Sequence, residues 1–84
     1  MTYRVEIARP AQKELKSLDG SVRARVASAI RSLADDPRPP GCVKLTNRDA
    51  WRIRIGDYRV VYEIHDQVLV VKIIDVGHRG DIYR

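Results

Sequence analysis

The sequence predicts an α+β domain in which two helices from the first half of the chain pack on one face of a mostly antiparallel four-stranded sheet, in the order β-α-α-β-β-β. Three observations predict it. Tyr3, Val5 and Ile7 alternate with charged residues, two apolar stripes with helical spacing follow, and β-branched residues are frequent in 51–76. A chain of 84 residues supports one hydrophobic core, so residues 1–84 are expected to form a single domain.

Both helices are indicated by their apolar spacing and by residues at their ends. The first helix begins at Pro10, where the missing N–H group costs nothing. The second extends over about 22–34, with Ser21 as its expected N-cap, and the Pro-rich segment 35–41 ends it. Its apolar stripe comprises Val22, Val26, Ala29, Ile30 and Leu33.

The second half of the chain is predicted to form strands. They are expected at 51–55, 58–64 and 68–76, and residues 43–45 form either a brief strand or the lead-in to one. A two-residue loop after the second of these strands would bring Lys72 opposite Val61.

The stretch WRIRIGDYRVVY reads as a hairpin with arginines on one side. A type II′ turn, with glycine first, sets Arg54 directly opposite Arg59 and puts Arg52 on the same face. Like charges in that position are destabilising unless something neutralises them. Local acids could do so, and the candidates are Glu63, Asp57 and Asp81. A bound polyanion could also do so, because arginine forks match phosphate oxygens, and the excess of arginines over nearby acids favours this hypothesis.

Composition narrows the functional classes. The net charge of +5 suggests a polyanionic partner. The single cysteine, Cys42, fits a reducing cytosol, and no signal pattern or apolar run long enough to cross a bilayer is evident. We therefore expect a cytoplasmic protein without a membrane partner. His65 and His78 lack metal-ligand spacing, so no metal or other cofactor is expected.

The C-terminal stretch VGHRGDIYR adds residue types suited to RNA backbone chemistry. The ordinary pKa of His78 lies near neutrality. Arg79 can hold a phosphate, and Tyr83 can stack on a base or pass a proton. The alternative for this segment is a frayed polar terminus.

An aromatic residue and a basic-x-basic pattern precede the hairpin turn, YRVVY follows it, and GHRGDIYR ends the given sequence. Together these features resemble the RelE/ParE toxin superfamily, and the resemblance extends across essentially the whole chain. The resemblance implies a RelE-like fold and the toxin of a bacterial or archaeal type II toxin–antitoxin system. It also implies a cognate RelB-like antitoxin that forms a hetero-oligomer with the toxin. The RelE branch cleaves mRNA in the ribosomal A site without metal, so the ribosome and mRNA are the further partners that it implies.

The resemblance also assigns roles to individual residues. Arg52 and Arg54 match two basic, RNA-binding positions of the RelE branch, where lysines are also found. Arg59 matches an arginine that holds the scissile phosphate, and Arg79 matches a further phosphate contact. Tyr83 matches a terminal tyrosine that stacks on a base, although its spacing from Arg79 is shorter than in the best-known RelE pattern.

The expected reaction is attack of the 2′-OH on the adjacent phosphorus, which gives a 2′,3′-cyclic phosphate and a free 5′-OH. Arginine stays protonated, so His78 is the first candidate for proton transfer and Tyr83 the second. Lys72 is a further RNA-binding candidate. His78 is also similar to the histidine of the YoeB-type branch, but PRPPGCVKL offers no clear counterpart of that branch's catalytic glutamate. Two alternatives remain: a ParE-like DNA gyrase inhibitor without nuclease activity, and a catalytically weak antitoxin-binding module.

Overall fold

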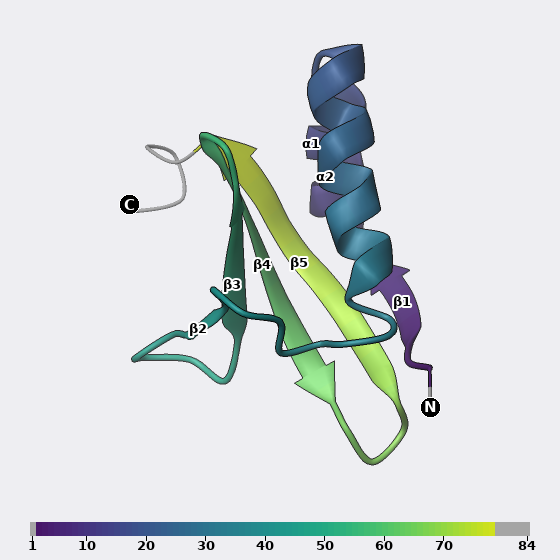
Figure 1. The fold of residues 1–84 in the computed structure, drawn as a ribbon, viewed down its shortest axis with the longest axis vertical. Coiled ribbons are helices and arrows are strands. Elements are labelled where there is room, and N and C mark those ends of the chain that lie inside the picture. The colour runs from purple at the N-terminus through teal and green to yellow at the C-terminus, as the bar shows by residue number, and fades with distance from the viewer. Residues whose placement is uncertain (1, 79–84) are drawn as a thin grey trace.

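Two layers make up the protein, a five-stranded sheet and a pair of helices that both lie on one side of it (Figure 1). The structure is a computed structural model and describes residues 2–78. Its elements are β1 (Arg4–Ile7), α1 (Arg9–Ser17), α2 (Gly20–Ser32), β2 (Val43–Lys44), β3 (Trp51–Ile55), β4 (Tyr58–His65) and β5 (Val70–His78). The predicted fold class is confirmed. The sheet has one strand more than predicted, because the two residues of β2 pair with β3.

The strand order in the sheet is β1-β5-β4-β3-β2, so the two longest strands, β4 and β5, lie at its centre. β1 is parallel to β5, and every other neighbouring pair is antiparallel. A parallel pair needs a long crossover connection. The segment between β1 and β5 contains both helices and the other three strands.

The helices begin close to the predicted positions. Pro10 lies in the first turn of α1, as predicted. The N-cap of α2 is Asp19 rather than Ser21, so the predicted cap was wrong by two residues. Neither helix has a side-chain hydrogen bond at its N-cap, and packing on the sheet must therefore hold them in place. In the part of the chain that the structure describes, no helix is long and apolar enough to cross a membrane.

The β3–β4 hairpin has the predicted register. Arg54 lies opposite Arg59, and Trp51 lies opposite Tyr62 at the other end of the pairing. Gly56 has a φ of +60°, whereas Asp57 does not have a positive φ, as a type II′ turn requires.

The β4–β5 connection differs from the prediction. His65 pairs with Val70, so the loop has four residues rather than two, with Leu69 in the left-handed region at φ 55°. A β-bulge then shifts the register between Val61 and Tyr62. Lys72 consequently lies opposite Glu63, and its predicted position opposite Val61 was wrong.

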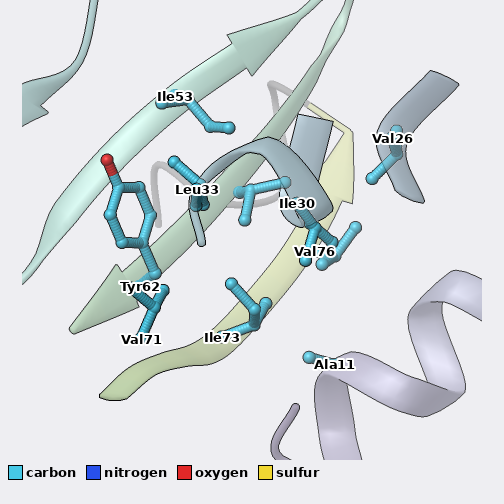
Figure 2. Close-up of a cluster of buried hydrophobic side chains, with 10 residues drawn as sticks. Ala11, Val26, Ile30, Leu33, Ile53, Tyr62, Val71, Ile73 and Val76 are labelled. Atoms are coloured by element: carbon cyan, nitrogen blue, oxygen red, sulfur yellow. The ribbon is translucent and has the colours of Figure 1, made fainter. Parts of the chain in front are cut away.

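The core lies between the helices and the sheet (Figure 2). Ile30 of α2 and Leu33, the C-cap of that helix, face the buried side chains of β4 and β5 in this view, among them Tyr62, Ile73 and Val76. These residues are at most 3% exposed, so removing one of the larger side chains is expected to cost about 2–5 kcal/mol of folding free energy.

The Pro-rich connection after α2 is fastened to the sheet by polar contacts. The buried Tyr62 Oη donates a hydrogen bond of 2.7 Å to the Pro37 carbonyl, and burial raises the pKa of this phenol. Arg38 Nη2 lies 2.9 Å from Asp66 Oδ2, and its guanidinium stands 5.2 Å from the centre of the Trp51 ring. Tyr3 Oη donates to Asp66 Oδ1 at 2.6 Å, so this carboxylate links the Pro-rich connection and the residue before β1 to the β4–β5 loop.

Candidate nucleic-acid interface

The sheet face opposite the two helices carries the three arginines of the hairpin, and we call it the arginine face. Ile53, Val60 and Tyr62 point into the core, so the alternating residues between them point to the opposite side. The arginines differ in exposure: Arg54 is exposed, Arg52 is half-buried and Arg59 is only 2% exposed.

Cross-strand pairing arranges the arginine face in rows that run across β3, β4 and β5. One row is Arg54–Arg59–Gly77, and the next is Arg52–Val61–Asp75. Gly77 presents no side chain beside Arg59. Arg54 and Arg59 are therefore direct cross-strand neighbours in the first row, and arginine side chains suit phosphate because their forks match its oxygens.

The acidic residues near the arginine face differ in their location and in their ion pairing. Glu63 Oε1 lies 2.9 Å from His65 Nε2, and Asp57 is exposed in the hairpin turn. Asp81, the third acid that the sequence suggested, lies outside the described residues. Asp75 is exposed on the arginine face and takes part in none of the ion pairs found within residues 2–78.

Lys72 lies on the same face but in a different setting. Its neighbour on β4 is Glu63 and its neighbour on β1 is Glu6, so acids flank it on both sides. The structure therefore does not bring Lys72 together with Arg59, and its RNA-binding role stays a prediction.

His78 lies on the other side of the sheet from the arginines. It pairs with Tyr58, whose ring packs against the core, and the two rings meet edge to face with centroids 5.4 Å apart. His78 and Arg59 thus lie near the same end of the β4–β5 pair, but their side chains are on opposite faces of the sheet. Arg79 and Tyr83 lie outside the described residues, so their predicted roles stay predictions as well.

Asp75 is the residue of this face that sequence reasoning missed. A lone acid between Ile74 and Val76 signals an outward-facing position, but the choice of face depends on a bulge that the apolar pattern does not reveal. Among residues 2–78, no three His, Cys, Asp or Glu side chains form a group that could hold a metal ion.

Comparison with known proteins identifies the family. The model of the ParE toxin family, from the type II toxin–antitoxin system parDE, matches residues 5–83. The chain belongs to the RelE/ParE toxin superfamily. Toxin RelG of Mycobacterium tuberculosis is 34% identical to this toxin over 88 residues, covering 100% of the chain and 99% of the relative. The mRNA interferase toxin RelE of Escherichia coli is 29% identical over 93 residues, covering 99% and 92%.

Solved structures agree with this assignment. The toxin is similar to the archaeal RelE–RelB complex from Pyrococcus horikoshii, with 35% identity, a TM-score of 0.85 and coverage of 95% of this chain and 98% of that chain. It is also similar to the intact Escherichia coli RelBE toxin–antitoxin complex, with 29% identity, a TM-score of 0.80 and coverage of 90% and 95%. The superfamily includes toxins named ParE and toxins named RelE, and the arginine face bears on the choice between them.

Proposed function

We propose that this toxin is a ribosome-dependent endoribonuclease that cleaves mRNA in the A site by metal-independent attack of the 2′-OH. We also propose that a RelB-like antitoxin holds it inactive in a hetero-oligomer. The observation that carries the proposal is the direct cross-strand pairing of Arg54 with Arg59, with Arg52 in the next row. The 29% identity to a relative named mRNA interferase toxin RelE supports it.

The arginines would supply binding and charge stabilisation. Guanidinium groups hold phosphate oxygens through paired hydrogen bonds, and their positive charge is preorganised for the negative charge that develops on the reacting phosphate. Such stabilisation is often the largest single contribution to catalysis. Arginine does not release its proton near neutral pH, so another group must take the proton of the 2′-OH.

Inhibition of DNA gyrase is the second candidate function, because the matching family model describes ParE toxins. A gyrase inhibitor acts by binding and has no use for a preorganised phosphate site. A module that only binds an antitoxin would use the basic face as a docking surface for an acidic segment. These functions differ in whether RNA is cut.

Expression of the toxin in cells, followed by mapping of mRNA 5′ ends, separates the three candidates. We expect cuts positioned on codons, strongly reduced by Arg59→Ala, Arg79→Ala and Arg54→Gln. Arg31→Gln, which neutralises an exposed arginine on α2, is the matched control and should cleave normally. Arg59 is buried, so melting temperatures must accompany its variant, whereas exposed Arg54 tests the same site with less risk to folding. Intact mRNA together with gyrase-linked DNA breaks would overturn the proposal.

A further inference from the structure

The β-bulge in β5 determines which side chains reach the arginine face. Val71 and Ile73 are buried on the helix side of the sheet. Strict alternation would put Asp75 on that side as well. Val61 pairs with Asp75 but Tyr62 pairs with Ile73, so Ile74 is the extra residue of the bulge. Val76 therefore takes the next core position, and Asp75 turns to the arginine face.

The charged surroundings of Asp75 are mainly cationic. Arg52 lies in the same row across Val61, and Arg59 is a diagonal neighbour on β4, about 7–8 Å away between Cα atoms at the usual spacing. Glu63 is the other diagonal neighbour on β4. On the β1 side, Glu6 lies opposite Lys72, and Arg9 follows the strand at the start of α1. Asp75 is exposed, and its carboxylate is in none of the ion pairs found between residues 2 and 78.

The proposed reaction needs a proton acceptor on this face. The three arginines stay protonated, and His78 lies on the helix side of the sheet. A carboxylate beside the phosphate-binding groups is a suitable general base, because Asp and Glu commonly act in this role. We propose that Asp75 is the general base that accepts the 2′-OH proton, an inference that rests on the proposed endoribonuclease function.

In the proposed step the Asp75 carboxylate removes the proton of the 2′-OH while the 2′-oxygen forms a bond to the adjacent phosphorus. The bond from phosphorus to the 5′-oxygen of the next nucleotide breaks, and that oxygen takes a proton from water. The hydroxide that remains takes the proton from Asp75, which restores the carboxylate. The products are a 2′,3′-cyclic phosphate and a free 5′-OH, with no change in oxidation state. Arg59 and Arg54 would hold the phosphate during this exchange.

The Asp75→Asn variant distinguishes a general base from a carboxylate that acts only through its charge. Asp75→Asn removes a negative charge from a cationic face, so RNA binding should be unchanged or tighter. If Asp75 only weakened RNA binding, the variant would cleave as fast as the wild type or faster. If Asp75 is the base, the variant binds at least as well but cleaves slowly.

The test is single-turnover cleavage of a defined mRNA on purified ribosomes, with the toxin in excess, from pH 5.5 to 8.5. Binding of each variant to the same programmed ribosomes is measured in parallel. Asp75→Asn should lower the cleavage rate about 100-fold without weakening binding, and Asp75→Glu should recover part of the rate. Glu63→Gln changes the neighbouring acid of the same face and should leave the rate close to that of the wild type.

Normal cleavage by a folded Asp75→Asn variant at every pH would overturn the inference while leaving the proposed function intact. Loss of binding equal to the loss of rate would also overturn it. A wild-type protein that cleaves no mRNA on ribosomes would instead overturn the proposed function.

Discussion

At the scale of single residues, His78 shows how pairing register can redirect a functional hypothesis. A histidine beside an arginine in a polar tail is a natural candidate for proton transfer, and the sequence predicted that role. The strand continues through His78, however, and its ring packs edge to face on Tyr58 on the helix side of the sheet. This contact suggests that His78 helps to fix the end of β5, the point from which the chain continues toward Arg79.

Two substitutions separate a packing role of His78 from a proton-transfer role. His78→Phe should keep the aromatic contact and cleave mRNA with the wild-type pH dependence. His78→Ala should lose the contact and about 1 kcal/mol of stability, the usual worth of an aromatic pair. Urea unfolding and cleavage rates measured on the same preparations check both expectations. A stable but inactive His78→Phe variant would restore histidine as an acid or base.

Asp66 makes stability depend on pH in a defined direction. The Arg38 guanidinium, and then the Tyr3 hydroxyl, lower the pKa of the Asp66 carboxyl from its ordinary value of about 3.9. A folded-state pKa below the unfolded value contributes stability above the unfolded pKa, and this contribution is lost as pH falls through the folded pKa.

We expect Asp66→Asn to be less stable than the wild type at pH 6, with a difference that shrinks as the pH falls below about 4. Thermal unfolding of both proteins from pH 6 to pH 3 measures this difference. Glu6→Gln, which removes the exposed partner of Arg4, serves as the control acid. A difference between wild type and Asp66→Asn that stays constant across the acid range would contradict the assignment.

At the scale of elements, the β3–β4 hairpin was predictable and the β4–β5 pair was not. The glycine-first turn fixes the first register locally, and every predicted pair from Trp51 with Tyr62 to Ile55 with Tyr58 is present. The second register depends on a four-residue turn and a bulge. β5 has consecutive apolar residues at 70–71 and 73–74, so its sequence pattern cannot show where alternation is interrupted.

The hairpin turn should be sensitive to a single added methyl group. Gly56 has φ +60°, and a Cβ atom placed there would lie 3.2 Å from Arg25 Nη2. Gly56→Ala should therefore lower the free energy of unfolding by about 1–2 kcal/mol, most of it from the backbone conformation, since the arginine tip can move.

Gly20→Ala is the matched control for the turn variant. Gly20 starts α2 without a positive φ, and nothing lies within 4 Å of its added Cβ. This substitution should be neutral or stabilise the protein by up to about 1 kcal/mol. Urea denaturation of both variants tests the comparison, and equal effects at the two glycines would show that the turn does not require Gly56.

At the scale of the whole molecule, the fold followed from alternation in the first strand, two helical stripes and the hairpin signal. The site followed only in part. The arginine face was predicted because three of its members belong to one hairpin with a locally fixed register. Asp75 was missed, and the position of Lys72 was wrong, because both depend on long-range pairing of β5.

The proposed role of the arginine face is to bind an RNA phosphate and to support cleavage of the RNA chain at that point. The most direct measurement is the end chemistry of mRNA cut on purified ribosomes by wild type, Arg54→Gln and Arg31→Gln. We predict A-site cuts with 2′,3′-cyclic phosphate and 5′-OH ends for wild type and Arg31→Gln, and little cutting for Arg54→Gln. Uncut mRNA with the wild-type protein, or equal cutting by a folded Arg54→Gln variant, would contradict the claim.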